Sequence, residues 1–243
     1  MKQVAELIMN QQPCVALTGA GISVESGIPT FRSKGGLWEK FDPAVYASIE
    51  VFRQDPSKYW SIRGEFIRNY DDYSPNAGHL ALAELETMGL LRHVITQNID
   101  GLHRKAGSRN VTEIHGSLRE IFCVRCGKEY RAPKIPEGMP PLCVCGGVLK
   151  PNTVLFGESL PPQALETASR QAGTCKVMLV IGTSAVVQPA ASLPFVARQN
   201  GARIVEVNIQ NAFPAADFRI AEKAGVALSG IVAELKKLPF QGC

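Results

Sequence analysis

Residues 14–23, CVALTGAGIS, join a short apolar run to a glycine-rich turn. The run Cys14–Thr18 has the length and composition of a strand buried on both faces of a parallel sheet. Similar runs that end in small or polar residues are His93–Ile95, Val177–Ile181 and Arg203–Val207. Helical patterns occupy His79–Met88, Pro162–Ala172, Ala190–Gln199 and Gly230–Leu238. This alternation predicts an α/β fold with a doubly wound parallel sheet, which binds ligands at the carboxyl ends of its strands.

Two segments interrupt the alternation. Residues 32–76 are rich in aromatic and turn-forming residues, which indicates a helical or irregular insertion. Residues 119–150 hold a cysteine cluster and the stretch RAPKIPEGMPP, too loop-like to pack without an added staple. We therefore predict a smaller domain formed by residues 32–76 and 119–150. The large domain would comprise residues 1–31, 77–118 and 151–243.

Composition limits the functional classes. The chain has 243 residues, 45% of them hydrophobic, and a net charge of +4 with its basic residues scattered. That distribution gives no footprint for nucleic acid or a membrane surface. No apolar run reaches the roughly 18–20 residues that cross a bilayer, and the N-terminal stretch lacks the pattern of a signal peptide. We expect a cytoplasmic protein and favour a monomer.

Four of the seven cysteines lie close together, in the pairs Cys123/Cys126 and Cys143/Cys145. Four thiolates in two close pairs suit a tetrahedral Zn²⁺ ion, and a site with four protein ligands is closed and therefore structural. The alternatives are a redox CxxC motif or four reduced surface thiols. A redox motif needs neither the second pair nor its flanking glycines, so we expect one structural zinc. The second pair is CxC, tighter than the usual CxxC.

The turn Gly19-Ala20-Gly21 follows the first strand, where a phosphate-binding loop would lie. Val24 stands where the third glycine of G-x-G-x-x-G would be, and no acidic residue ends a strand about 20 residues on. The residues alone leave a nucleotide site and a tight turn both open. Phe31 could be a core aromatic residue or could shield a reactive sugar from water. Arg32 could be a solvated charge or could bind a phosphate of a dinucleotide.

The chain resembles the sirtuins along nearly its whole length. The stretches that carry the resemblance, in the family's order and spacing, are GAGISVESGIPTFR (19–32), TQNIDGLHRKAG (96–107), EIHGSLR (113–119), the cysteine pairs, VLFGE (154–158), GTSAVVQPAASLP (182–194) and VEVN (205–208). The resemblance implies a Rossmann-like domain, a smaller zinc-binding plus helical domain, and a cleft between them. There NAD is consumed to remove acyl groups from protein lysines, giving nicotinamide and O-acyl-ADP-ribose.

The resemblance also implies roles for particular residues. His115 and Asn98 would be catalytic. NAD would contact Gly19, Ala20, Gly21, Thr30, Phe31, Arg32, Trp38, Gln97, Asn98, Ile99, Asp100, Gly182, Thr183, Ser184, Asn208 and Ala224. The peptide would contact Val154, Phe156, Gly157 and Glu158, whose main chain would offer bonds to an incoming strand.

The histidines can be weighed on physical grounds. A neutral imidazole is suited to accept a ribose hydroxyl proton near pH 7. His115 lies between the QNID segment and the cysteine module, and the following glycine allows close approach of a ligand. We interpret His79 and His93 as packing or surface residues and expect a supporting role for His103. Asp100 could also cap a short helix that begins at Gly101.

The acyl group is less determined. The stretches GTSAVVQPAASLP and GGLW resemble the family branch that removes succinyl and other acidic groups with a Y-x-x-R pair. Here Arg63 stands at the Tyr position and Phe66 at the Arg position, so that signature is missing. We expect Arg63 and Phe66 to line the acyl site and an apolar Phe66 to favour acetyl. Desuccinylation or demalonylation remains an alternative, since Arg63 or Arg68 could reach a carboxylate differently.

Two other functions fit part of the pattern. An ADP-ribosyltransferase would pass the same ribose to a protein nucleophile. A non-catalytic NAD-binding or zinc module would be expected to lack His115 or Asn98, and both are present.

Overall fold

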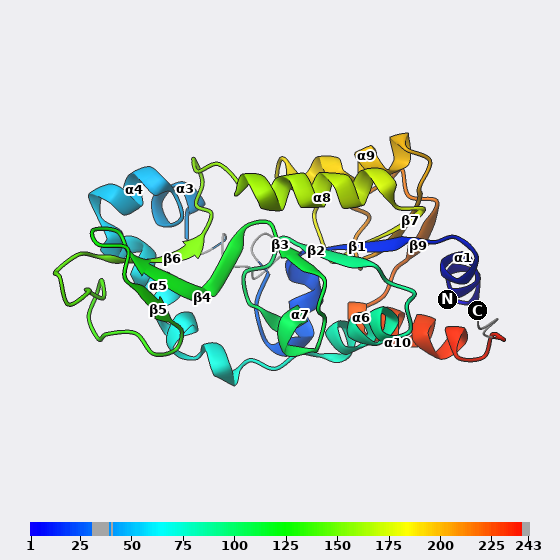
Figure 1. The fold of residues 1–243 in the computed structure, drawn as a ribbon, viewed down its shortest axis with the longest axis horizontal. Helices are drawn as coiled ribbons and strands as arrows, with labels where there is room; N and C mark the ends of the chain where they lie inside the picture. Colours follow the sequence, from blue (N-terminus) through cyan, green and yellow to red (C-terminus); the bar gives the residue numbers. More distant parts are fainter. Residues whose placement is uncertain (31–38, 40, 240–243) are drawn as a thin grey trace.

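A six-stranded parallel sheet forms the centre of the larger part of the molecule (Figure 1). Its order is β3-β2-β1-β7-β8-β9. The strands are β1 (Cys14–Thr18), β2 (His93–Thr96), β3 (Val111–Glu113), β7 (Val177–Ile181), β8 (Arg203–Val207) and β9 (Phe218–Ile220). The chain extends the sheet from β1 in one direction and then from β7 in the other. The carboxyl ends of β1 and β7 therefore form the topological switch point at which such sheets bind ligands.

Helices cover both faces of this sheet (Figure 1). On one face lie α1 (Lys2–Asn10), α6 (Ala77–Thr87) and α10 (Ala224–Leu235), which bury Ile8, Leu82 and Leu228 against the strands. On the other face lie α8 (Pro162–Thr174) and α9 (Leu193–Gln199), preceded by the 3₁₀ turn η3 (Ala190–Ser192). The strands are buried on both faces, which explains why they are nearly continuous apolar runs. The predicted α/β doubly wound fold is confirmed.

A separate three-stranded antiparallel sheet lies beyond β3, with the order β5-β4-β6. Its strands are β4 (Gly116–Cys123), β5 (Glu129–Arg131) and β6 (Leu149–Thr153). The helices α3 (Pro43–Tyr46), α4 (Ile49–Gln54) and α5 (Pro56–Arg68), with the turn η2 (Tyr70–Asp72), pack around it. Trp60 is fully buried there, and its indole N–H donates to the Leu149 carbonyl at 2.9 Å. Both β4 and β6 run across the predicted domain boundaries at 118/119 and 150/151; those boundaries stay predictions.

The structure describes residues 1–30, 39 and 41–239. Phe31, Arg32 and Trp38 lie outside this part of the chain. The structure adds α1, β3 and β9 to the predicted elements, and α10 begins six residues before the predicted Gly230. Within the described residues, no helix is long and apolar enough to cross a membrane.

Candidate active site at the strand switch point

The loop after β1 packs directly on the loop after β7. The Gly19 N–H donates to the Ile181 carbonyl at 3.0 Å, and the Gly21 N–H donates to the Gly182 carbonyl at 2.7 Å. A Cβ at Gly21 would lie 2.7 Å from the Gly182 Cα, and Gly182 itself has a φ of 56°. The glycines were predicted to admit a phosphate. The structure shows that Gly21 is also required for this contact between the two loops.

We expect Gly21→Ala to weaken NAD binding, since the added methyl group meets backbone that cannot rotate away. Overpacking of this kind costs about 1–3 kcal/mol, and titration calorimetry with NAD measures the loss. Gly173→Ala is the matched control, because a Cβ there meets nothing closer than 4.0 Å and lies within α8. It should keep NAD affinity and add roughly 0.5–1 kcal/mol of stability. Unchanged NAD affinity in Gly21→Ala would contradict the packing argument.

Asn98 is buried behind this loop in a polar network. Its side-chain amide donates to the Gly19 carbonyl and to the Ser23 hydroxyl, both at 3.1 Å. The Ser23 hydroxyl donates to Asp100 Oδ2 at 2.7 Å, and Asp100 Oδ1 accepts the Leu102 N–H at 3.0 Å. The helix α7 (Leu102–Lys105) thus begins one residue later than predicted, with Asp100 bonded to its first turn. Both bonds come from the amide nitrogen of Asn98, so they hold its side chain in one orientation.

His79 completes the network, although the sequence indicated only a packing or surface role. His79 is fully buried, and its Nδ1 accepts the Asn76 N–H at 3.3 Å. The ring proton is therefore on Nε2, which lies 3.5 Å from the Ser23 hydroxyl. Burial lowers the pKa of His79 to about 4 and raises the pKa of Asp100, which the Leu102 N–H and the Ser23 hydroxyl counteract. His79 is therefore neutral at physiological pH. Neither Ser23 nor His79 stood among the candidate site residues.

His103 supports Asn98 from the other side, as expected for a supporting residue. Its Nε2 lies 2.9 Å from the Thr18 hydroxyl, which donates to the Thr96 hydroxyl at 2.8 Å. Thr96 in turn accepts the Asn98 N–H at 3.0 Å. Burial lowers the pKa of His103 well below its ordinary value, with the nearby His79 as a second cause. This chain of bonds ties the end of β1 to the end of β2.

His115 lies half-buried at the end of the segment that follows β3. Its Nδ1 is 3.0 Å from the Gln97 carbonyl oxygen. A carbonyl oxygen only accepts, so Nδ1 carries the hydrogen and, in the neutral ring, Nε2 carries the lone pair. The His115 carbonyl accepts the Val154 N–H at 2.9 Å. His115 is therefore fixed both to the strand ends and to the segment that follows β6.

The side chains after β2, β7 and β8 join one another across the sheet. The Gln97 amide donates to the Thr183 hydroxyl at 2.9 Å, and the Asn208 amide donates to the Thr183 carbonyl at 2.8 Å. Ser184 is exposed beside them, and Ala224 is buried at the start of α10. These positions lie along one edge, as a dinucleotide site requires.

Glu25 is a further polar residue at this edge that the sequence did not single out. Its carboxylate accepts the Gly225 N–H at 2.8 Å, in the first turn of α10. A carboxylate is stabilised at a helix N-terminus by the unsatisfied N–H groups and the helix dipole. The contact ties the glycine loop to the helix that begins at Ala224.

The segment 154–158 is held by main-chain bonds on one side. The Phe156 N–H donates to the Ala47 carbonyl at 2.9 Å, and its carbonyl accepts the Ile49 N–H at 3.0 Å. The Phe156 ring is exposed, and Gly157 has a φ of 88°. Because the polar main-chain groups of Phe156 are already paired, a peptide strand would have to bond elsewhere in the segment.

The candidate acyl residues lie on α5. Arg63 is half-buried near Tyr59, and burial lowers its pKa, which the Tyr59 phenol counteracts. Phe66 stacks on Tyr73 with ring centroids 4.6 Å apart. Of the other predicted contacts, Ile99 bonds through its carbonyl to the Leu118 N–H at 2.9 Å and Thr30 is half-buried.

The four cysteines of the small sheet form one cluster, with all four Sγ atoms within 4.8 Å of one another. The distances Cys123–Cys145, Cys126–Cys143 and Cys126–Cys145 are 3.5, 3.7 and 3.4 Å. Four bonds of about 2.3 Å in a tetrahedron separate the sulfurs by about 3.8 Å. The N–H of Cys145 and then the Tyr130 hydroxyl lower the pKa of Cys143 to about 6, which favours the thiolate. The cluster fits one structural zinc, and both cysteines of the CxC pair lie close to that spacing from a cysteine of the CxxC pair.

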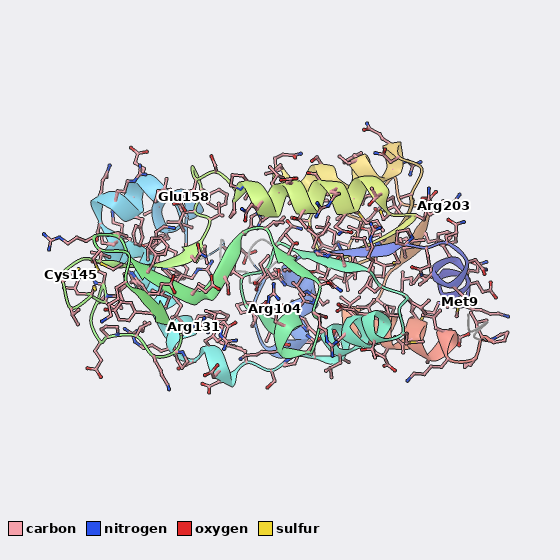
Figure 2. The ribbon with its side chains drawn as sticks, in the orientation of Figure 1. Met9, Arg104, Arg131, Cys145, Glu158 and Arg203 are labelled. Atoms are coloured by element: carbon pink, nitrogen blue, oxygen red, sulfur yellow. The ribbon has the colours of Figure 1, made fainter. Side chains whose placement is uncertain are left out.

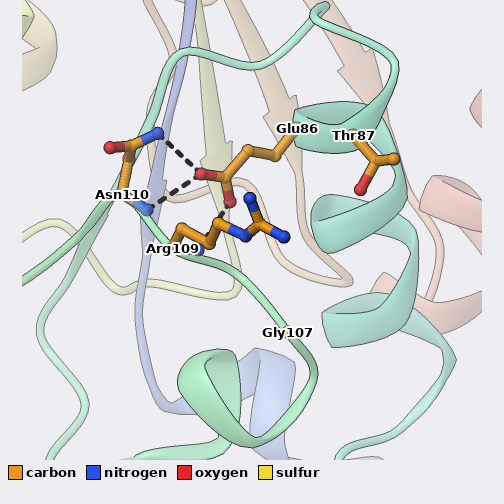
Figure 3. A pocket seen from close by; sticks show the side chains of 5 residues that line it. All are labelled: Glu86, Thr87, Gly107, Arg109 and Asn110. Carbon is orange, nitrogen blue, oxygen red and sulfur yellow. Dashed lines mark hydrogen bonds between the residues drawn. The ribbon is translucent and has the colours of Figure 1, made fainter.

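A pocket away from these residues has a structural role (Figure 3). It is lined by Glu86, Thr87, Gly107, Arg109 and Asn110. The Glu86 carboxylate accepts the N–H groups of Arg109 and Asn110 at 2.9 and 2.8 Å and the Asn110 side chain at 2.7 Å. These contacts tie the end of α6 to the amino end of β3, at the opposite edge of the sheet from His115. The hydrogen bonds of Glu86 therefore anchor the loop that holds Arg109 and Asn110.

Comparison with known proteins agrees with this geometry. A profile described as the Sir2 family matches residues 19–189. An NAD-dependent protein deacylase 2 of Pyrobaculum aerophilum is 49% identical over 96% of this chain and 95% of its own length. An NAD-dependent protein deacylase 1 of Archaeoglobus fulgidus is 44% identical, with 97% and 98% covered. A crystal structure of a Sir2 homolog–NAD complex has a TM-score of 0.88 at 44% identity, covering 98% of this chain and 94% of that one.

The chain therefore belongs to the Sir2 family, as the sequence resemblance predicted. Its activity is that of an NAD-dependent protein deacylase, with NAD as co-substrate. Which residues contact NAD and the acylated peptide stays a prediction.

Proposed function

We propose that this enzyme removes acetyl groups from lysine side chains of proteins, giving free lysine, nicotinamide and O-acetyl-ADP-ribose. The observation that carries the proposal is the tautomer of His115, whose Nδ1–H is committed to the Gln97 carbonyl so that Nε2 carries the basic lone pair. A Sir2 structure with a deacetylated p53 peptide and 3′-O-acetyl-ADP-ribose supports it, with a TM-score of 0.91, 37% identity, and 96% of this chain and 98% of that one covered.

In the proposed reaction, His115 Nε2 accepts the proton of a ribose hydroxyl as that hydroxyl attacks the acyl carbon. The acyl oxygen has by then replaced nicotinamide at the ribose C1′, and one water is consumed for each lysine released. The imidazolium is stabilised where it forms, because its Nδ1–H points at a carbonyl oxygen. The Gln97 carbonyl thereby helps to orient the His115 ring.

We propose that Asn98 and Asp100 hold the nicotinamide ribose and carboxamide. Their side chains are pre-oriented by Ser23, so little entropy is lost when the substrate binds. The adenosine half would lie along Thr183, Ser184, Asn208 and Ala224, at the ends of β7 and β8 and the start of α10. Gly19, Ala20, Gly21 and Thr30, with the undescribed Phe31, Arg32 and Trp38, would enclose the diphosphate and nicotinamide.

The acylated peptide is proposed to add as a strand beside residues 154–158. Since the Phe156 main chain is bonded to Ala47 and Ile49, the peptide would take its bonds from Gly157 and its neighbours. The acyl chain would then extend toward α5. A monomer located in the cytoplasm, as expected from the sequence, also stays a prediction.

Acetyl preference is proposed from the residues of α5. Phe66 is committed to a stack with Tyr73 and offers no charge to an acyl carboxylate. We expect deacetylation to exceed desuccinylation by about tenfold or more, as a missing guanidinium–carboxylate pair would imply. The measurement is kcat/KM on matched acetyl-, butyryl-, malonyl- and succinyl-lysine peptides.

A variant pair sharpens this test. Phe66→Arg should raise kcat/KM for the succinyl peptide relative to the acetyl peptide. Phe66→Leu should leave this ratio unchanged. A wild-type enzyme that prefers succinyl would overturn the proposed preference. Mass analysis of the products separates the alternative activity, because ADP-ribose attached to protein would identify a transferase.

A further inference from the structure

Lys150 is buried as the second residue of β6, with 7% of its surface exposed. Lysine is seldom buried unless its charge is paired, because removing an ammonium group from water is costly. The strand around it is clamped by α5: Trp60 bonds the Leu149 carbonyl, and the Tyr59 hydroxyl lies 3.3 Å from the Thr153 hydroxyl. Lys150 therefore has little freedom to move toward solvent.

The Lys150 ammonium group contacts one carboxylate and two main-chain carbonyl oxygens of the residues that follow Lys150. Its Nζ lies 3.0 Å from Glu158 Oε2, 3.0 Å from the Thr153 carbonyl oxygen and 3.5 Å from the Pro151 carbonyl oxygen. The same Glu158 oxygen accepts the Leu155 N–H at 2.8 Å. Figure 2 labels Glu158 on the connection that leaves β6. One ion pair thus closes residues 153–158 into a fixed turn.

This turn carries functional groups on both sides. Its Val154 N–H donates to the His115 carbonyl, and its Phe156 main chain bonds to Ala47 and Ile49. The Glu158 N–H donates to the Leu155 carbonyl at 2.9 Å, which sets the direction of Gly157. A shift of the Glu158 side chain would therefore move the stretch against which the peptide is proposed to lie.

We propose that Lys150 is a positioning residue for the acylated substrate: through Glu158 it holds the main chain of residues 154–158 in the conformation that receives the peptide. This rests on the proposed peptide site. Lys150 touches no substrate itself. Its effect is on the peptide side of the reaction and leaves the NAD side, at the ends of β1, β7 and β8, unchanged.

The test compares KM values in the zinc-loaded enzyme. Lys150→Met should raise KM for an acetyl-lysine peptide about tenfold or more, since small misplacements of a substrate are costly. KM for NAD and NAD affinity by calorimetry should stay within about twofold of wild type. Lys150→Arg, which keeps a cation at this position, should have a peptide KM close to that of wild type. Lys134→Met, which removes an exposed lysine of the same module, is the matched control and should match wild type.

A double variant separates positioning from simple stability. Lys150→Met alone leaves Glu158 without this cation, whereas Lys150→Met with Glu158→Gln removes both charges and keeps an acceptor for the Leu155 N–H. The double variant should be closer to wild type in peptide KM than Lys150→Met. A folded Lys150→Met enzyme with unchanged peptide KM overturns the proposal, as does a double variant no better than the single one. If wild type releases no nicotinamide with any acyl peptide, the proposed function itself fails.

Discussion

His115→Ala is expected to lower the turnover number for deacylation by about 10²–10⁴-fold, the range associated with loss of a general base. The side chain is half-buried, and its ring bond is to the Gln97 main chain, so truncation removes the basic nitrogen without opening the core. NAD affinity and melting temperature should stay close to wild type. The measurement is single-turnover formation of O-acetyl-ADP-ribose from an acetyl-lysine peptide.

His93→Ala is the matched control. His93 opens β2 at the amino edge of the sheet, and its Nε2 lies 2.8 Å from the Thr112 hydroxyl. Its loss should cost some stability and leave turnover intact. Full activity in His115→Ala would refute the role of the base, and a loss of turnover in His93→Ala equal to that in His115→Ala would show that the assay reports folding instead.

Removal of zinc is expected to unfold the small antiparallel sheet. A closed four-cysteine site contributes its binding free energy to folding, on the order of 10 kcal/mol for structural zinc. The hydrophobic cluster there includes Cys123 and Cys143 beside Leu149 and Trp60, so the metal and the core stabilise each other. Cys143→Ala should therefore abolish stoichiometric zinc, expose Trp60 to quenchers and abolish peptide binding.

Cys175→Ala provides the comparison for the metal prediction. Cys175 is buried directly after the end of α8 and lies outside the cluster. This variant should retain one zinc per chain by elemental mass spectrometry, with an unshifted Trp fluorescence spectrum. Retention of one zinc per chain in Cys143→Ala would contradict the assignment of that thiolate as a ligand.

Strand positions were well determined by sequence because strands buried on both faces must be apolar throughout. Cys14–Thr18, Val177–Ile181 and Arg203–Val207 have the predicted bounds. The edge strands were missed for the same physical reason. The edge strand β9 reads Phe-Arg-Ile and is only partly buried, so it carries no continuous apolar signal.

The site was only partly predictable. The spacing of the cysteine pairs along the chain is enough to predict a zinc site. Ser23 and His79 do not, because their contact joins positions 56 residues apart, and Glu25 meets Gly225 across 200 residues. Nothing local distinguishes His79 from a core histidine in a helix. Only the packing of α6 against the glycine loop reveals that it faces Ser23.

The segment around His115 joins the two sheets. Gly116, with a φ of 76°, begins β4 opposite Thr153, and a Cβ there would overlap the Asn152 carbonyl. One residue earlier, the His115 carbonyl bonds Val154. The main chain of His115, whose ring contacts the Gln97 carbonyl, is thus bonded to the segment 154–158 that is proposed to receive the peptide. We expect a relative motion of the two sheets to carry His115 and the segment 154–158 together, because this bond joins them.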